Sequence, residues 1–532
     1  MFFEKIFFYC MAFLCFSRLG EAFAGGGKDL NSEVAGGFSP VVEGKFKEPC
    51  FSADSIVINE DNDHFFKGKP EDMTEKGLRD YISNFSGGKI THIFMCPNGQ
   101  RTSYKSNVHE PIWECAPDAP HRNIWCDNCK RLYDAGIDPY SVWIDECRKQ
   151  KISPWITVRM NDVHFITIPG YFRTMDYWRK HPELWRVPYK DLGKGGAWTD
   201  FAFNYAKKEV RDFQFSLIKE LFERYDFDGI ELDWMRFCAH LTPGKGMEES
   251  KFLTEFVGDV KRLAQCWEKK RGHPIKISVR VPATIETSKY LGMDAVEWAR
   301  LGYVDLIVPS CFFETADFDI PSGEWRKSVA DSGGRAQVAP ATDNGVCAYP
   351  GKARSPLDWA LLNGWASNSY ARGAEFLYIF NLPYNPELLA LVAKNGLSRE
   401  DVAGRSRRHP ITYRDFLECK SRQDKKIALP KYSPCQFDVF VGDRAPMNAS
   451  VGVVLGFDKE NAEENLPNVF LNGRKAVSAQ RAELPLVNYG SSKSAVRFVF
   501  PTDSLAAGLN RISVESDTPE KIVWVEIFVD AG

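Results

Sequence analysis

Short apolar, β-branched runs alternate with longer amphipathic segments from about residue 55 onward. The runs predict eight β-strands, at 55–61, 90–99, 153–162, 227–234, 275–283, 304–312, 336–345 and 375–384. Apolar residues at helical spacing predict helices at 72–85, 139–150, 205–225, 249–272, 293–301 and 355–366. Strand–helix alternation of this kind is typical of parallel strands joined by right-handed crossovers.

Eight such units fit a closed (β/α)8 barrel, the TIM-barrel fold, which we expect over residues 50–425. An open, doubly wound sheet is the alternative, but no GxGxxG follows the first predicted strand. The pattern changes after about residue 425 to short alternating runs between turn signals, which predicts a β-sandwich over 426–532. Two roles remain open for this sandwich: a stabilising cap on the barrel, or an accessory carbohydrate-binding module.

The first residues are typical of a secretory signal peptide. The apolar run MFFEKIFFYCMAFLCF carries a lysine near its start, and Ala22-Phe23-Ala24 follows as a small-x-small cleavage pattern. We therefore expect a signal peptide at 1–24, a linker at 25–49, and a secreted or periplasmic protein without stable membrane insertion after cleavage.

The composition of the chain excludes few classes of protein and agrees with an exported one. The formal net charge is −3 over 532 residues and there is no basic stripe, so we expect no nucleic-acid partner. Of the 14 cysteines, Cys10 and Cys15 leave with the signal. Cys126 and Cys129 form a CxxC pair, for which a disulfide or two plain thiols is a better interpretation than zinc. No other metal-ligand spacing occurs, and we expect neither a metal nor a cofactor.

The fourth predicted strand, in FDGIELDW, places two carboxylates in an otherwise apolar segment. Alternate residues of a strand face opposite sides, so Glu231 and Asp233 should point into the barrel while the apolar set faces the helices. Arg159 and Arg280 on the flanking strands can point inward too. We expect Glu231 to form a structural ion pair with these arginines, and Asp233, nearer the mouth, to be available for chemistry.

Polar residues follow the strands, where the active sites of such barrels lie. After the first strand come Asn59, Glu60, Asp61 and His64. As substrate-binding residues we predict a set that follows the third, fourth, seventh and eighth strands: Asn161, Asp162, His164, Arg236, Asp343, Asn344 and Tyr384. Several arginines around one mouth suit an anionic or sulfated glycan, although ion pairing with the neighbouring acids explains them as well.

DGIELDWMRF resembles the fourth-strand motif of (β/α)8 glycoside hydrolases. In the chitinase-like pattern DGxDxDxE, the first three acidic positions match Asp228, Glu231 and Asp233, and Met235 stands where the acid Glu would be. With WITVRMNDVH and TDNGVCAYP, the chain resembles secreted bacterial glycoside-hydrolase-like barrel proteins and, more distantly, glycoside hydrolase family 168, the endo-fucanases. The resemblance implies a glycosidase acting on a polysaccharide or oligosaccharide.

Glycoside hydrolysis requires two carboxyl groups beside the scissile bond. We predict Asp233 as the ionised nucleophile or base, and Glu286 or Glu314 as the general acid, with Asp343 as a further candidate for that role. The alternative from another functional class is a carbohydrate-binding protein on a degenerate glycosidase barrel, which Met235 keeps open.

Overall fold

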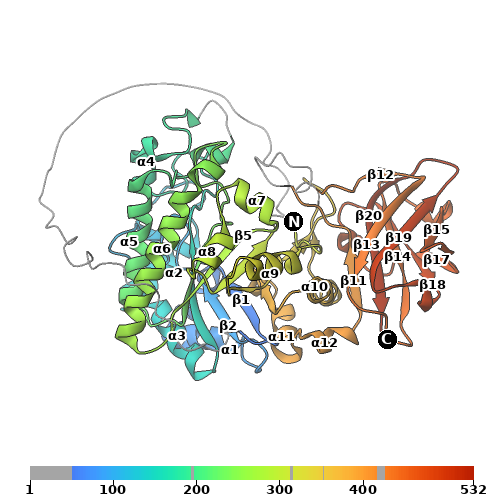
Figure 1. Cartoon of the computed structure of the whole chain (residues 1–532), viewed down its shortest axis with the longest axis horizontal. Helices are drawn as coiled ribbons and strands as arrows, with labels where there is room; N and C mark the ends of the chain where they lie inside the picture. Colours follow the sequence, from blue (N-terminus) through green and yellow to red (C-terminus); the bar gives the residue numbers. More distant parts are fainter. Residues whose placement is uncertain (1–50, 193–196, 312–314, 352, 416–425) are drawn as a thin grey trace, which may run out of the picture.

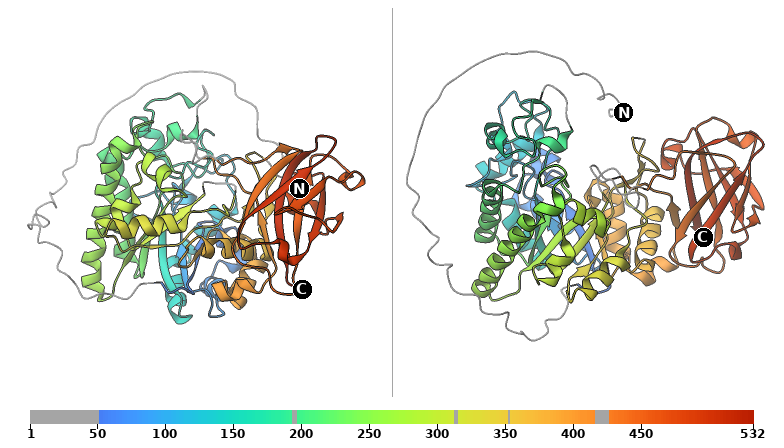
Figure 2. Two further views of the ribbon diagram at one scale, coloured as in Figure 1. Left: turned by 45° about the vertical axis from the view of Figure 1, so that its right-hand side comes forward. Right: turned by 45° about the horizontal axis from the view of Figure 1, so that its top comes forward.

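The computed structural model describes residues 51–192, 197–311, 315–351, 353–415 and 426–532 (Figure 1). It contains a parallel barrel and an antiparallel β-sandwich side by side, as Figures 1 and 2 show from three directions. The predicted signal peptide at 1–24 and linker at 25–49 lie outside the described residues. Within the described residues, none of the helices is both long and apolar enough to cross a membrane.

All eight predicted barrel strands are confirmed. They are β1 (Ile56–Glu60), β2 (His92–Met95), β3 (Ser153–Arg159), β4 (Gly229–Asp233), β5 (Lys276–Pro282), β6 (Leu306–Ser310), β7 (Gln337–Val338) and β10 (Leu377–Ile379). They form one sheet in the order β10-β1-β2-β3-β4-β5-β6-β7. Beyond β7 the chain closes the ring, since Ala341 bridges Tyr378 of β10 in parallel. The alternative of an open, doubly wound sheet is therefore wrong.

Helices surround this ring, and each of the six predicted helices is present. Those six are α1 (Glu75–Ser83), α3 (Pro139–Lys149), α5 (Lys208–Arg224), α6 (Gly246–Arg271), α8 (Ala295–Arg300) and α10 (Trp359–Ala371). The others are α2 (Ile124–Asp134), α4 (Asp176–Lys180), α7 (Ile285–Tyr290), α9 (Ser322–Asp331), α11 (Pro386–Asn395) and α12 (Arg399–Ala403). Local capping defines several ends: Asp138 accepts from two backbone amides at the start of α3, and Gly272 ends α6 with φ 78°.

Aromatic side chains close the interior of the barrel on the side where the strands begin. Trp155 stacks on Phe94 with ring centroids 4.5 Å apart, and Phe51 packs against Trp155 at 5.5 Å. Gly229 of β4 sits beside this layer, where a Cβ atom would lie 2.4 Å from the Trp155 ring. The glycine is required here because any side chain would collide with the indole.

The C-terminal β-sandwich is built from two antiparallel sheets. One has the order β11-β20-β14-β18-β17, with β12 also on β20, and the other has the order β13-β19-β15-β16. The strands are β11 (Arg407–Pro410), β12 (Lys431–Tyr432), β13 (Cys435–Val441), β14 (Ser450–Phe457), β15 (Asn468–Leu471), β16 (Arg474–Lys475), β17 (Ser478–Arg481), β18 (Ser494–Phe500), β19 (Gly508–Glu515) and β20 (Lys521–Asp530). The sandwich thus takes β11 from a stretch before residue 426, where we expected it to begin.

The barrel and the sandwich are joined through α10 and β11, which contact each other directly (Figure 1). Arg408 of β11 is buried at this junction. It donates to both carboxylate oxygens of Glu526 on β20, at 3.0 and 2.9 Å, and to Asp358 at the start of α10, at 2.6 Å. The junction also includes a short hairpin of β8 (Gly345–Val346) and β9 (Ser355–Pro356), where Ser355 donates to the carbonyl of Asn488 at 3.1 Å.

Candidate functional site

The polar interior of the barrel is organised in rows that the strand register sets. Thr157, Glu231 and Ser278 form one row across β3, β4 and β5. Arg159, Asp233 and Arg280 form the next row, one pleat nearer the C-terminal mouth. The apolar residues between them on β4 belong to the core outside the sheet. The predicted alternation, with both carboxylates pointing inward, is confirmed.

Glu231 is held by hydroxyl groups. Its carboxylate accepts hydrogen bonds from Thr157 at 2.7 Å, Ser278 at 2.9 Å and Tyr378 of β10 at 2.8 Å. The expected ion pair of Glu231 with Arg159 and Arg280 is wrong, because both arginines lie one row higher and pair with aspartates. Burial, followed by the negative charge of Asp233, raises the pKa of Glu231. Glu231 is thus an interior group without access to substrate, and its side chain fixes three strands.

Asp233 forms the ion pair that was expected for Glu231. Arg280 donates Nε to Oδ1 and Nη2 to Oδ2 of Asp233, each at 2.9 Å, and the Met235 amide donates to Oδ1 at 3.0 Å. Among the described residues, Oδ2 accepts a hydrogen bond from Arg280 alone. Met235, which replaces the acid of the chitinase-like motif, is buried. Its contribution is therefore a backbone contact to Asp233.

Arg159 connects the carboxylates that follow β1 and β3. It donates to Asp162 at 2.7 Å and is also bonded to Asp61. Asp162 accepts from the backbone and the Nδ1 of His164, at 2.9 and 2.7 Å, and from Arg173 at 3.2 Å. Burial alone would raise the pKa of Asp162, but the positive partners lower it well below the usual range. Asp162 is thus a fixed anion that positions His164.

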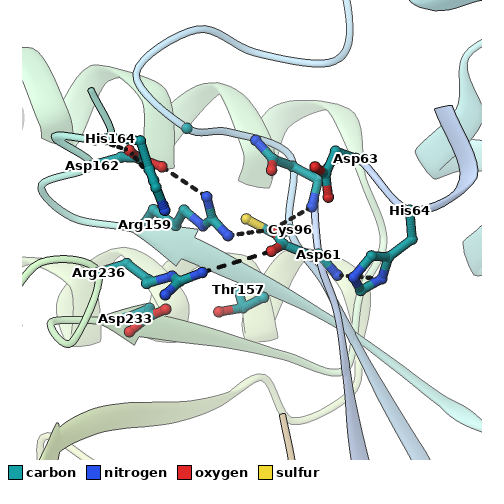
Figure 3. A network of polar contacts seen from close by, with 12 residues as sticks. Asp61, Asp63, His64, Cys96, Thr157, Arg159, Asp162, His164, Asp233 and Arg236 are labelled. Carbon is teal, nitrogen blue, oxygen red and sulfur yellow. Dashed lines mark hydrogen bonds and ion pairs between the residues drawn. The ribbon is translucent and has the colours of Figure 1, made fainter. Parts of the chain in front are cut away.

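Arg236 lies at the mouth between two acidic groups, as Figure 3 shows. Its guanidinium is 3.9 Å from Asp61 and lies over the Phe380 ring at 5.2 Å. Burial and the charge of Arg159, with a further contribution from Arg280, lower the pKa of Arg236 despite Asp61. The three arginines thus lie among three aspartates, Asp61, Asp162 and Asp233, which balance their charge.

Asn161 does not face the mouth as a substrate-binding residue would. Its Nδ2 donates to the carbonyls of Phe203 and Ala239, both at 2.9 Å, and its Oδ1 accepts from the Phe203 amide at 2.9 Å. The residue is 3% exposed. The prediction that Asn161 binds substrate is wrong, because its amide is used to join three loops around the mouth.

The remaining predicted residues lie on loops at the C-terminal ends of their strands. Asp343 and Asn344 follow β7, and Arg354 contacts both, at 3.5 and 2.7 Å respectively. Tyr384, after β10, is 49% exposed and donates to Asp63 at 3.0 Å. Glu286 is exposed in the first turn of α7, directly after β5. Glu314 lies outside the described residues.

In the sequence, Asp61 was noted after the first strand without being given a role, and Asp63 was not named. Asp61 is 5% exposed and contacts Arg159 and Arg236, while Asp63 pairs with Lys67. Asp61, Asp63 and His64 are also close enough to share a metal ion. Arg159, Arg236 and Lys67 already neutralise the carboxylates of Asp61 and Asp63. Burial lowers the pKa of His64, but the negative charges of Glu60 and Asp61 outweigh it and raise this pKa. The donor set therefore does not fit a divalent metal.

Chemically, the mouth combines the Asp233 carboxylate, which a bidentate arginine fixes, with further acids, the partly buried His164 and the half-exposed ring of Tyr384. Such a site can stabilise positive charge that develops on a substrate and can bind hydroxyl groups. Burial lowers the pKa of His164 to about 4, so this imidazole is neutral near pH 7. A neutral imidazole with its Nδ1 on Asp162 is suited to hydrogen bonding with a substrate.

The sequence matches no protein-family model and no curated protein sequence. Similar solved structures include several glycoside hydrolases. An endo-β-1,4-mannanase from Thermotoga petrophila is 10% identical over 88% of this chain and 97% of its own, with a TM-score of 0.42. An α-L-fucosidase from a Vibrio species is 12% identical over 88% and 72%, with a TM-score of 0.36.

A cycloisomaltooligosaccharide glucanotransferase from Paenibacillus is 11% identical over 90% of this chain, with a TM-score of 0.34, and this chain spans 57% of that enzyme. At such identities and scores, the likenesses carry no argument about activity, which must come from the residues of the site. The resemblance to glycoside hydrolase family 168 stays a prediction.

Proposed function

We propose that the protein is a glycoside hydrolase that cleaves O-glycosidic bonds of a polysaccharide at the C-terminal mouth of the barrel. The observation that carries the proposal is Asp233, an inward carboxylate at the end of β4 whose negative charge Arg280 stabilises through two hydrogen bonds of 2.9 Å. Burying an ionised group is costly unless its partners are fixed. The catalytic groups of (β/α)8 barrels lie at this mouth, so a carboxylate fixed here is well placed for catalysis.

In this proposal Asp233 acts as nucleophile or base. Because Arg280 and the Met235 amide occupy Oδ1, the second oxygen, with its single partner among the described residues, is the one that would face the anomeric carbon or a water. Arg280 also fixes the direction of this carboxylate through its two hydrogen bonds. Such preorganisation favours the transition state because the group need not reorient during reaction.

A second carboxyl group must donate a proton to the leaving oxygen. Glu286 and Asp343 follow β5 and β7 at the same end of the barrel as Asp233, and Glu314 remains a candidate from sequence. The separation of this group from Asp233 decides the stereochemistry: about 5 Å gives retention and roughly 6.5–9.5 Å gives inversion.

The proposed substrate-binding groups lie around this centre. Tyr384 offers an exposed ring, His164 a neutral imidazole, and Asn344 an amide beside Arg354. Arg236 lies near two other arginines, and a sulfate or carboxylate on the glycan would relieve their mutual repulsion. The proposed substrate class therefore includes anionic and sulfated polysaccharides.

The remaining proposals concern export and domain roles. We propose that residues 1–24 are removed as a signal peptide and that the protein is secreted or periplasmic. We propose the barrel, expected within 50–425, as the catalytic domain. We propose the sandwich, expected at 426–532 and extended by β11, as an accessory domain that supports the barrel or binds glycan.

The test is product release from a panel of neutral, carboxylated and sulfated polysaccharides, each sulfated glycan paired with its desulfated form. Reducing ends released by the wild type establish hydrolysis, and a loss on desulfation supports the anionic class. Glu286→Gln, Glu314→Gln and Asp343→Asn would then be compared on the active substrate, with the acid expected to lose activity by about 10²–10⁴-fold. Glycan binding without any release by the wild type would favour the non-catalytic carbohydrate-binding protein.

A further inference from the structure

Two cysteines face each other beside the mouth-forming loops. Cys115 follows a short 3-10 helix at Ile112–Glu114, and Cys126 lies in the first turn of α2. Their Sγ atoms are 3.9 Å apart, and the two residues are 7% and 0% exposed. Both cysteines are thiols in this structure.

We propose that Cys115 and Cys126 are a disulfide site, oxidised by exchange with a low-molecular-weight disulfide such as oxidised glutathione. A disulfide has an S–S length of about 2.05 Å, so the two sulfurs, 3.9 Å apart, must approach by about 2 Å to form the bond. Oxidation at this site is expected in the exporting compartments that the N-terminal segment predicts.

The surroundings of Cys115 suit the first step of exchange. The contact with Cys126 lowers its pKa, and the positive charges of Arg101 and Arg122 act in the same direction. The contact with Cys115, together with burial, raises the pKa of Cys126. A thiolate is the attacking species in exchange, so Cys115, which is also the more exposed of the two, is the thiol that reacts first.

The exchange is balanced in two steps. The Cys115 thiolate attacks one sulfur of oxidised glutathione, forming a mixed disulfide and releasing one glutathione thiolate. Cys126 loses its proton to solvent and attacks the Cys115 sulfur, which releases the second glutathione thiolate. Two protein thiols are oxidised, and one glutathione disulfide is reduced to two glutathione molecules.

The geometry selects Cys115 over the CxxC neighbour as the partner of Cys126. Cys129 is buried and lines a cavity of about 260 Å³ with Ser103 and Tyr104. Cys126 instead contacts Cys115, which lies 11 residues before it in the chain. A Cys126–Cys129 disulfide, which the CxxC spacing allowed, would have to form within α2 and away from this contact.

The proposed bond would fasten one wall of the mouth. Arg101 connects the segment before Cys115 to the loop after β3. Its guanidinium pairs with Glu110 at 2.8 Å, and its Nε donates to the carbonyl of Thr174 at 3.2 Å. Thr174 belongs to the loop that also carries Asp162 and His164. Cross-linking Cys115 to α2 would therefore limit the opening of this loop region.

The test is peptide mapping of the full chain after incubation with a mixture of oxidised and reduced glutathione, acid quenching, and alkylation in denaturant. Trypsin places Cys115 in peptide 106–122 and both Cys126 and Cys129 in peptide 123–130. We expect the two peptides to be joined, with Cys129 alkylated. Recovery of the two peptides unlinked, with three alkylated thiols or with a Cys126–Cys129 bond, would overturn the proposal.

Two matched variants assign the bond without depending on activity. Cys126→Ser should abolish the joined peptide, while Cys129→Ser, three residues further along the same helix, should leave it in full yield. Joined peptides that persist in Cys126→Ser, or that disappear in Cys129→Ser, would assign the bond to Cys129 and contradict the proposal. Because the wild-type map already decides between the two pairs, a poorly folding variant does not remove the test.

Discussion

Asp233 and Arg280 face each other from adjacent parallel strands, with Nε and Nη2 of the arginine each 2.9 Å from a carboxylate oxygen. Both side chains are buried, at 2% and 4% exposure of the residues. The strand register places the pair in one row with Arg159, above the row that contains Glu231. The pair thus holds a negative charge at the mouth while satisfying the arginine that accompanies it.

Breaking this pair should destabilise the barrel strongly. Asp233→Leu leaves a buried guanidinium without its carboxylate, which costs about 3–5 kcal/mol, whereas replacing both partners by apolar residues costs much less. We therefore expect the double variant Asp233→Leu/Arg280→Met to be more stable than the sum of the two single variants predicts. Denaturant unfolding measures this coupling, and strict additivity would show that the two side chains do not interact.

The buried Glu231 should make stability depend on pH. Its pKa is raised in the folded protein above the ordinary value of 4.5, so the folded state binds the proton more tightly than the unfolded state. The contribution of Glu231 to stability is therefore fully present below pH 4.5 and is lost as the pH rises toward the raised folded value. Glu231→Gln, which cannot ionise, should show a weaker decline over this range.

Urea unfolding of wild type and Glu231→Gln at several pH values measures the difference directly. The stability of the variant relative to the wild type should increase from pH 5 and level off above the folded pKa of Glu231, about 7. A constant difference across the range would mean that Glu231 does not change its protonation on unfolding. The comparison must be between the two proteins, because burial raises the pKa of Glu60 and Glu526 as well.

Tyr384 should contribute to substrate binding through its ring. The ring packs edge-on against His64 at 3.9 Å and is half-exposed at the mouth, while its hydroxyl bonds to Asp63. Losing a stacking surface worth about 1.4 kcal/mol weakens substrate binding about tenfold, which raises KM by the same factor. We expect Tyr384→Ala to raise KM by about tenfold and Tyr384→Phe to change it little. Equal effects of both substitutions would assign the role to the hydroxyl.

Asn161 should matter for stability because its amide serves three backbone groups. Asn161→Ala leaves the Phe203 amide and the carbonyls of Phe203 and Ala239 without their partner, and we expect a loss of roughly 2–4 kcal/mol. Asn344→Ala is the control, since the Asn344 side chain is less buried and accepts from Arg354. Chemical denaturation that gave equal losses for the two variants would contradict the anchoring role.

The periodicity of the chain predicted the fold well, because burial enforces it. A strand buried on both faces must read as a short apolar run, and each of the eight runs became a barrel strand. Alternation also predicted that Glu231 and Asp233 point inward. It could not predict their partners, since parity defines a face and leaves the register between strands undetermined. In the register of the structure, both arginines lie in the row of Asp233, and the hydrogen-bond partners of Glu231 are hydroxyl groups.

Loop residues were harder to predict than strand residues. Asn161 lies two residues after the end of β3, and nothing in the sequence indicates that its amide meets Phe203 and Ala239, which lie 42 and 78 positions away. Asp61 was visible as a polar residue after the first strand, but its contacts with Arg159 and Arg236 depend on the barrel bringing β1 close to β3 and β4. Such contacts between distant segments follow from topology and have no local sequence pattern.

The most direct test of the central claim compares Asp233→Asn with Asp305→Asn. Asp305 precedes β6 at the opposite end of the barrel and is also ion-paired, with Lys276 at 3.0 Å and Lys261 at 3.2 Å. Product release from an active polysaccharide would be measured at equal concentrations of folded protein, verified by circular dichroism. We predict that Asp233→Asn loses activity by several orders of magnitude while Asp305→Asn keeps that of the wild type. Activity near the wild-type level in folded Asp233→Asn would contradict the account.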